Sequence, residues 1–223
     1  MVFITGTDTG CGKTHVSCAL LRQLAAIGVP AAGMKPVATG ATLHAGALLN
    51  EDAELLRVAS PVRMPPWAQN PYLFELPASP HISARREGAE ISPGRIKAAF
   101  RESQHHAAVV VVEGVGGWCV PIAAGYSVAE LVRDLSIPVV LVVGLKLGCI
   151  NHALLTAGAL AVQEAPVLGW VANEVDPGLE AVEEVLETLD ELLPFERLGY
   201  CRWQDQADLE RLCSILTSSQ ESG

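Results

Sequence analysis

The chain has 223 residues, of which 50% are hydrophobic and 18% are charged, and its formal net charge is -10. This much apolar sequence can fill a hydrophobic core, and the length fits one domain or a tight pair. Nucleic-acid binding needs a basic surface, so a chain this acidic is not expected to bind nucleic acid. No apolar run reaches the ~18 residues of a transmembrane helix, and no positively charged leader opens the sequence. We therefore expect a cytoplasmic protein with no membrane partner.

Short apolar runs alternate along the chain with helical patterns. Strands are predicted at residues 2–5, 29–35, 107–112, 138–143, 167–172 and 195–200. Helices are predicted at residues 13–27, 127–135, 149–163, 179–192 and 206–216, with Gly28 just past the end of the first. This alternation is typical of an α/β fold with a mostly parallel β-sheet flanked by helices. We predict a single domain over residues 1–216 and a frayed polar tail over residues 217–223.

Residues 61–80 break this rhythm, because the segment holds six of the fourteen prolines of the chain. We predict an irregular excursion between two units of the sheet. Long loops in such folds often carry function or contact a partner, but a surface loop without a role fits the composition equally well.

Residues 6–14 read Gly-Thr-Asp-Thr-Gly-Cys-Gly-Lys-Thr, between the first predicted strand and the first helix. This is the context of a phosphate-binding loop, in which glycines and a helix N-terminus turn backbone N–H groups toward an anion. Lys13 can reach the β- and γ-phosphates, and the Thr14 hydroxyl can ligate Mg²⁺. The usual pattern has glycine where Thr7 stands, so this is a variant loop. It predicts a nucleoside triphosphate site with Mg²⁺ rather than a ligand-free turn.

Polar residues also follow other predicted strands, and ligands of open α/β sheets bind at those strand ends. Glu113 follows the strand at residues 107–112, where its carboxylate suits Mg²⁺, although a sharp turn with an exposed glutamate is the alternative. Lys35 ends the second strand and could neutralise a phosphoryl group, or it could be an ordinary surface lysine. Asp52 lies at a predicted helix start, where local sequence favours a simple interaction with the helix dipole.

Two further positions have polar groups that could bind a ligand. The segment from Lys146 to His152 opens a helix whose free N–H groups could hold a carboxylate. Asn173 follows the next strand, where its amide could bind an adenine edge or stabilise a turn. The sequence has no Gly-x-Ser-x-Gly elbow, His-Glu-x-x-His motif or zinc-type cysteine spacing, so those chemistries have no support.

Seven blocks, taken together and in order, resemble the dethiobiotin synthetase family. They are the Gly-Thr-Asp-Thr and Gly-Lys-Thr of residues 6–14, the Lys-Pro-Val-Ala-Thr-Gly of 35–40, the Asn-Pro-Tyr of 70–72, the Ser-Pro-His of 79–81, the Glu-Gly and Gly-Gly-Trp of 113–118, residues 146–152 and the Gly-Trp-Val-Ala-Asn of 169–173. Each block alone is weak evidence, but seven in order are specific.

The resemblance implies a fold of the P-loop NTPase type and an ATP- and Mg²⁺-dependent enzyme of biotin biosynthesis. Its reaction closes the ureido ring of dethiobiotin from 7,8-diaminopelargonic acid and CO₂, through a carbamate and a carbamic–phosphoric mixed anhydride. Such a reaction needs two anions to be aligned and their charge to be neutralised, and it needs little acid–base chemistry from the protein. The resemblance also implies a homodimer whose active site lies at the subunit interface.

The resemblance further assigns roles to individual residues. The implied catalytic residues are Lys13, Lys35, Thr9 and Thr39, and the implied metal ligands are Thr14, Asp52 and Glu113. The implied nucleotide site comprises Gly10, Cys11, Gly12, Lys13, Thr14, Asp52, Glu113, Gly114, Val115, Gly116, Asn173, Arg202 and Trp203. The implied substrate site comprises Lys35, Thr39 and Gly116, together with Leu147, Gly148, Cys149 and Asn151 of the partner subunit.

Some positions depart from the family pattern. Gly10 stands where some members carry an acidic residue, and Thr39 replaces a serine but keeps a hydroxyl. Arg202 and its neighbours stand where a Pro-Trp pair often occurs, which predicts looser selection of the nucleotide base.

Two other families are alternatives. A ParA/MinD-like switch ATPase is the main alternative, but such proteins usually carry a second lysine where Asp8 stands, and a switch does not explain the Lys-Pro motif at Lys35. An amidotransferase-type cobyrinate ligase needs a glutaminase domain that the sequence does not show.

Overall fold

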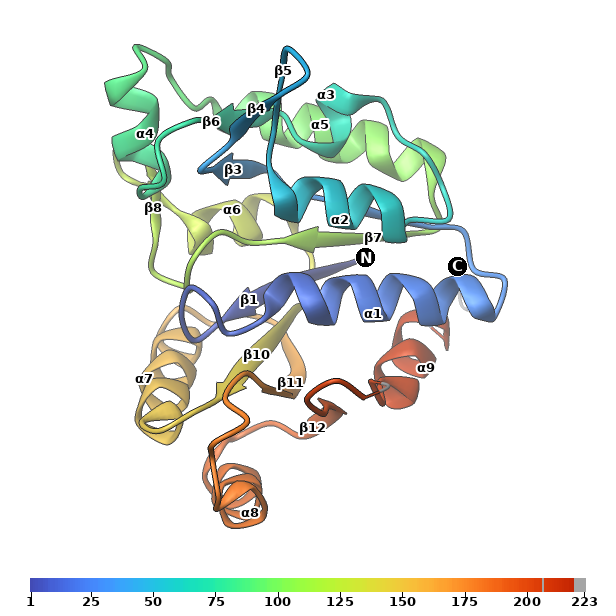
Figure 1. Ribbon diagram of the computed structural model, residues 1–223, viewed down its shortest axis with the longest axis vertical. Coiled ribbons are helices and arrows are strands. Elements are labelled where there is room, and N and C mark those ends of the chain that lie inside the picture. The colour runs from blue at the N-terminus through green and yellow to red at the C-terminus, as the bar shows by residue number, and fades with distance from the viewer. Residues whose placement is uncertain (206, 219–223) are drawn as a thin grey trace.

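A six-stranded parallel sheet forms the centre of the computed structural model, which describes residues 1–205 and 207–218 (Figure 1). The strand order is β12-β11-β10-β1-β7-β2, and every neighbouring pair is parallel. The strands are β1 (Val2–Gly6), β2 (Ala31–Met34), β7 (Val109–Glu113), β10 (Val139–Leu145), β11 (Val167–Glu174) and β12 (Arg197–Cys201). The α/β fold predicted from the sequence is therefore confirmed.

Both faces of the sheet are buried, because alternate residues of each strand point into different cores. In β7, Val109 and Val111 pack into one core, and Val110 and Val112 pack into the other. The first core lies under α1 (Lys13–Ala26), α2 (Glu51–Ala59) and α9 (Glu210–Ser218). The second lies under α5 (Pro93–His106), α6 (Val128–Leu135), α7 (Cys149–Val162) and α8 (Val182–Leu192). Burial on both faces explains the nearly continuous valine runs.

The chain leaves the main sheet for a long excursion between β2 and α5. It forms a parallel pair of β3 (Val37–Thr39) and β6 (Tyr72–Phe74) and a hairpin of β4 (Thr42–His44) and β5 (Ala47–Leu49). It also contains two short helices, α3 (Pro66–Gln69) before β6 and α4 (Pro80–Arg86) after it. The α4 helix contacts β8 (Pro121–Ala123), which pairs with β9 (Tyr126–Ser127). In Figure 1 the labelled elements α3, α4, β3, β4, β5 and β6 stand together at one end of the molecule.

The prediction that residues 61–80 are irregular is therefore wrong in part. The segment contains α3, β6 and the start of α4. Pro66 and Pro80 each occupy the first position of a helix, where proline needs no hydrogen-bond partner for its nitrogen and its fixed φ suits the helix. Proline thus marks helix starts here rather than structureless chain.

Several predicted boundaries shift. Glu113 and Asn173 belong to the last residues of β7 and β11 instead of following them, and the helix predicted from residue 179 begins at Val182. The final helix runs from Glu210 to Ser218, so residues 217 and 218 are helical rather than a frayed tail. Gln206 and residues 219–223, also included in those predictions, lie outside the described residues. Among the helices that the structure describes, none is long and apolar enough to cross a membrane.

Candidate functional site

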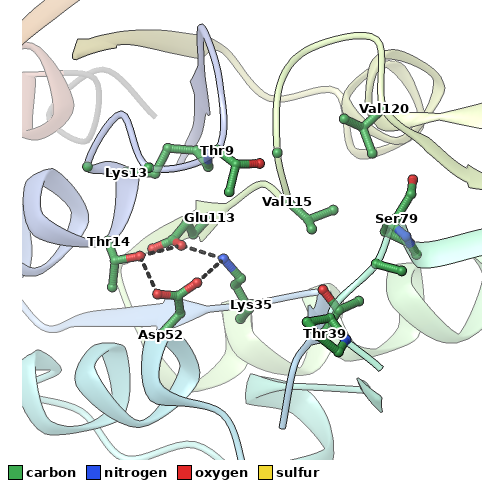
Figure 2. A pocket seen from close by; sticks show the side chains of 16 residues that line it. Thr9, Lys13, Thr14, Lys35, Thr39, Asp52, Ser79, Glu113, Val115 and Val120 are labelled. Carbon is green, nitrogen blue, oxygen red and sulfur yellow. Dashed lines mark hydrogen bonds and ion pairs between the residues drawn. The ribbon is translucent and has the colours of Figure 1, made fainter. Parts of the chain in front are cut away.

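A cavity of about 690 Å³ opens where β1, β2 and β7 end (Figure 2). Parallel strands bring their carboxyl ends to one edge of a sheet, so residues far apart in sequence converge there. Eleven residues that the sequence assigned to the site line this cavity: Thr9, Gly10, Gly12, Lys13, Thr14, Lys35, Thr39, Asp52, Glu113, Val115 and Gly116. The structure therefore brings most of the predicted phosphate, metal and reaction site into one place.

The register of the sheet places Lys35 beside Glu113. Met34 of β2 pairs with Val112 of β7. Lys35 and Glu113, which come next in the chain, therefore lie side by side. The Lys35 Nζ lies 2.5 Å from Glu113 Oε1, and it also donates a hydrogen bond to the Gly114 carbonyl oxygen at 3.2 Å. Both side chains are almost fully buried, which makes this an ion pair shielded from water.

Asp52 joins this pair from the first turn of α2. Its Oδ2 lies 3.0 Å from Lys35 Nζ, and its Oδ1 accepts a hydrogen bond from the Thr14 hydroxyl at 2.8 Å. Asn50 caps the N-terminus of α2, because its side chain accepts the Ala53 N–H, and its amide also donates to the Thr39 carbonyl oxygen at 3.0 Å. Asp52 is thus in the first helical turn, as predicted, but it also faces the cavity (Figure 2).

The groups around Lys35 and Asp52 shift the pKa values of these two side chains so that both stay ionised. Burial alone lowers the pKa of Lys35, but the neighbouring Glu113 and Asp52 outweigh it and raise the pKa above the ordinary lysine value. Burial alone raises the pKa of Asp52, but Lys35 and the Thr14 hydroxyl outweigh it and lower the pKa. Lys35 is therefore cationic and Asp52 anionic at neutral pH.

Three oxygen groups converge on one side of the cluster. The Thr14 oxygen lies 2.8 Å from Asp52 Oδ1 and 2.9 Å from Glu113 Oε1, but a hydroxyl has one hydrogen and can donate to only one of them at a time. The second carboxylate oxygen of Glu113 is buried and has no hydrogen-bond partner among the described residues. Hydroxyl and carboxylate oxygens are ligands of Mg²⁺, so Thr14, Asp52 and Glu113 could hold such a cation.

The phosphate loop wraps the start of α1. Gly12 has a φ of 87° and its ideal Cβ position lies 1.9 Å from Asn173 Nδ2, so both the backbone and the space require glycine here. The Asn173 amide donates to the carbonyl oxygen of the buried Cys11 at 3.0 Å. The Lys13 ammonium donates to the Asp8 carbonyl oxygen at 3.0 Å. β11 therefore supports the loop from one side, and Lys13 lies at the cavity wall.

A second cavity, of about 470 Å³, adjoins the loop on the side of β11 and β12. Its lining comprises Gly10, Gly12, His15, Asn173, Glu174, Val175, Arg202, Trp203 and Gln204. Glu174 fixes the far wall, because its Oε2 accepts the Trp203 N–H at 2.7 Å and its Oε1 accepts the Tyr200 hydroxyl. Gly10 and Gly12 line both cavities, so one ligand could extend across the loop from one to the other.

Comparisons with known proteins identify the family. A family model described as an AAA domain matches residues 1–211. The chain is 49% identical over 197 residues to the ATP-dependent dethiobiotin synthetase of Aromatoleum aromaticum, with 88% of each chain covered. It is 47% identical over 206 residues to that of Xanthomonas oryzae pv. oryzae, with 92% of each covered. The chain belongs to the dethiobiotin synthetase family.

Solved structures at low sequence identity share the fold of this family member. A ParA family ATPase from Chlorobium tepidum superposes with a TM-score of 0.55 at 14% identity, covering 99% of this chain and 92% of that one. A chain of the MinC:MinD cell division protein complex of Aquifex aeolicus gives a TM-score of 0.54 at 15% identity, covering 89% of this chain and 79% of that one. At such identities the likeness shows the fold alone, which this chain shares with both of these structures.

The residues that the dethiobiotin synthetase resemblance assigns to the partner subunit lie apart from both cavities. Leu147, Gly148, Cys149 and Asn151 stand at the start of α7 and line neither cavity. Leu147 is 92% exposed, whereas Cys149 is buried. Within one chain these residues therefore do not meet Lys35 or Thr39.

Sequence reasoning left several cavity residues without a role. Pro77, Ala78, Ser79, Pro80 and Val120 line the main cavity, opposite the phosphate loop. Ser79 and Pro80 belong to one of the blocks that resemble dethiobiotin synthetase, which is the signal that could have found them. Val120 stands in no motif, and its carbonyl oxygen accepts the Val128 N–H at 3.0 Å, which connects it to the start of α6.

The proline-containing segment also holds Lys35 in place. The Lys35 N–H donates to the Gln69 carbonyl oxygen at 2.8 Å, and the Asn70 amide donates to the Lys35 carbonyl oxygen at 2.7 Å. Both hydrogen-bonding groups of the Lys35 backbone are therefore satisfied by residues 69 and 70. The excursion both fixes a charged residue of the site and closes the cavity.

Proposed function

We propose that this protein is an ATP-dependent dethiobiotin synthetase that closes the ureido ring of dethiobiotin from 7,8-diaminopelargonic acid and CO₂. One observation carries the proposal beyond family membership. The main cavity continues from the phosphate loop past the buried Lys35 to Thr39 and the wall at residues 77–80, so it has room for a second substrate beside a triphosphate. A switch ATPase needs the loop but has no use for this extension.

Charge neutralisation is the main contribution of the protein to the proposed reaction. One amine of the diamine takes up CO₂ and releases a proton, giving a carbamate. A carbamate oxygen then attacks the γ-phosphorus and displaces ADP, and the second amine attacks the resulting mixed anhydride and expels phosphate. The transfer brings two anions together, and Lys13 and Lys35 lie in the cavity to offset their charge. Thr9 and Thr39 offer hydroxyl groups to the phosphoryl and carbamate oxygens.

Mg²⁺ fits the oxygens of Thr14, Asp52 and Glu113, and we include it in the proposal. When bound with ATP, this ion neutralises charge on the β- and γ-phosphates. Mg²⁺ usually keeps waters and substrate phosphates as further ligands, so a small protein ligand set suits it. Lys35 Nζ keeps one oxygen of Glu113 oriented and leaves the other free.

The second cavity suits the nucleoside part of ATP. It joins the phosphate loop at Gly10 and Gly12, and it offers the amide of Asn173 together with the side chains of Arg202 and Trp203. One N–H of the Asn173 amide is already engaged by Cys11, which leaves the carbonyl oxygen and the other N–H for a base edge. We therefore assign adenine to this cavity, with Trp203 as an aromatic surface on which it can stack.

The surface of α7 supports a homodimer. None of the 14 residues of this helix is Asp, Glu, Lys or Arg, although one side of it faces solvent. Leu147 just before the helix and Leu154, Leu155 and Val162 within it are exposed, the last two by 66% and 84%. Large apolar side chains that are exposed on or beside one helix support a protein–protein contact there. A dimer formed through α7 would carry residues 147–151 toward the active site of the other subunit, where they would bind the substrate carboxylate.

Product analysis tests the proposed reaction. Incubation with Mg·ATP, bicarbonate and 7,8-diaminopelargonic acid is expected to give a product with the mass of the diamine plus CO₂ minus one water, together with ADP and phosphate. Release of ADP should require both the diamine and bicarbonate, because the phosphoryl group has no acceptor without the carbamate. Mass spectrometry and an ADP assay measure the two results. ATP hydrolysis at the same rate without the diamine would contradict the proposal and favour a switch ATPase.

A charge on the exposed face of α7 tests the dimer. Light scattering should give about twice the 23.5 kDa of one chain for the unmodified protein and one chain mass for Leu155→Asp. The variant should bind Mg·ATP normally but lose ring closure, because residues 147–151 of the second subunit are missing from each site. Ile27→Asp is the matched control, since Ile27 is 60% exposed but follows α1. A dimeric Leu155→Asp, or a fully active monomer, would overturn the interface assignment.

A further inference from the structure

Asp8 and Lys146 form an ion pair that the proposed reaction does not use. Asp8 lies in the phosphate loop, and Lys146 follows β10, in the turn before α7. The Lys146 Nζ lies 3.3 Å from Asp8 Oδ2, and the two side chains are 35% and 46% exposed. Neither residue lines the main cavity. The pair therefore joins two segments that are separated by 138 positions, next to the site but outside it.

Asp8 organises the phosphate loop through its other oxygens. Its Oδ1 accepts the Thr9 N–H at 2.7 Å, and its backbone carbonyl oxygen accepts the Lys13 ammonium at 3.0 Å. Thr9 and Lys13 both line the main cavity. The aspartate thus holds two residues of the cavity wall, while its second carboxylate oxygen faces Lys146.

The same carboxylate brings a negative charge into a loop that binds a polyanion. Burial alone raises the pKa of Asp8, but the Thr9 N–H and Lys146 outweigh it and lower the pKa, so Asp8 is ionised at neutral pH. An unneutralised carboxylate at this place would repel a triphosphate, and water and salt would screen the repulsion only in part. Lys146 is the cation in direct contact with it.

We propose that Lys146 is a positioning residue of the phosphate loop, whose ammonium group neutralises Asp8 so that the aspartate can hold Thr9 and Lys13 without repelling the triphosphate. This inference rests on the proposed function only in assigning ATP to the main cavity. Lys146 acts through Asp8 and contacts none of the reacting atoms. It follows that removing Lys146 alone weakens ATP binding more than removing both charges together.

Calorimetric titration with Mg·ATP tests this order of affinities. Lys146→Met should bind about five- to tenfold more weakly than the unmodified protein, the size expected for one partly screened charge near a triphosphate. The affinity of the double variant Asp8→Asn/Lys146→Met for Mg·ATP should return to within about threefold of that of the unmodified protein, because the amide keeps an oxygen for the Thr9 N–H and has no charge. Lys146→Arg should retain affinity, because it restores the positive charge. Binding is measured rather than ring closure, so the result stands even if the protein makes another product.

Salt dependence and a matched pair separate neutralisation from a structural role. The deficit of Lys146→Met should shrink between 0.1 M and 1 M salt, because the Debye length falls from about 10 Å to about 3 Å. Lys97 pairs with Asp134 at 3.0 Å and the two side chains are also partly exposed, so Lys97→Met should leave ATP affinity unchanged. The proposal would be overturned if the double variant bound Mg·ATP as weakly as Lys146→Met, or if salt did not change the loss of affinity in Lys146→Met. Either result would mean that Lys146 contacts the ligand or supports the fold.

Discussion

Lys35→Met is expected to abolish most ring closure and to destabilise the fold at the same time. The side chain keeps its length but loses the ammonium group that we place beside the transferring phosphoryl group. Loss of one such electrostatic contact lowers kcat by about 10²–10³-fold. The variant also leaves Glu113 buried without its cation, since that carboxylate is fully shielded from solvent. Breaking a buried ion pair in this way should lower the free energy of unfolding by about 3 kcal/mol.

The double variant Lys35→Met/Glu113→Gln separates the two effects. A neutral glutamine beside methionine removes the uncompensated charge, so chemical denaturation should show that most of the lost stability returns. Ring closure should stay as low as in Lys35→Met or fall further, because neither the cation nor the carboxylate is restored. If activity returned together with stability, Lys35 would have only a structural role. If the single variant were as stable as the unmodified protein, the buried pair would not have the strength that its burial implies.

The parts of the site that sequence reasoning reached are those set by local chain geometry or by the direction of the strands. Lys13 and Thr14 occur in a loop whose spacing alone predicts phosphate binding. Glu113 and Lys35 were found because each stands at the end of an apolar run, and parallel strands bring such ends to one edge. The sheet register then explains their contact, because Met34 pairs with Val112.

Asp52 shows where local reasoning stops. Its place in the first turn of a helix was predicted, and an interaction with the helix dipole accounts for an aspartate there. Its contact with Thr14 joins residues 38 positions apart and depends on how α2 packs against α1. No periodicity within α2 encodes that packing. Only the resemblance to a family, which carries tertiary information from other chains, pointed to the site.

The excursion after β2 was the least predictable part of the fold. Its strands have three residues each and its two later helices have four and seven, so hydrophobic periodicity has too few residues in which to appear. Tertiary contacts determine its structure instead, through the pairing of β3 with β6 and the packing of α4 on β8. The cavity wall at residues 77–80 depends on these contacts and therefore could not be assigned from composition.

Glu113→Gln is expected to change the metal requirement while leaving nucleotide binding largely intact. The amide keeps the shape of the side chain but removes a negative charge from the proposed Mg²⁺ site. Weaker metal binding should raise the Mg²⁺ concentration for half-maximal activity about tenfold and lower kcat by about 10²-fold at ordinary Mg²⁺ levels. Lys35 keeps Asp52 at 3.0 Å and the Gly114 carbonyl at 3.2 Å, so the fold should lose less stability than in Lys35→Met.

Lys13→Met provides the contrast that makes the metal assignment testable. This variant should bind ATP weakly at every Mg²⁺ concentration, because the lost ammonium group acts on the phosphates directly. Glu113→Gln should instead approach the unmodified protein as Mg²⁺ increases. Titration of activity with Mg²⁺ at saturating ATP, together with calorimetric titration of the nucleotide, distinguishes the two patterns. If Glu113→Gln and the unmodified protein needed the same Mg²⁺ concentration for half-maximal activity, Glu113 would not be a metal ligand. The buried oxygen of that carboxylate would then need another partner, and Lys35 could not provide it without leaving the Oε1 that it holds at 2.5 Å.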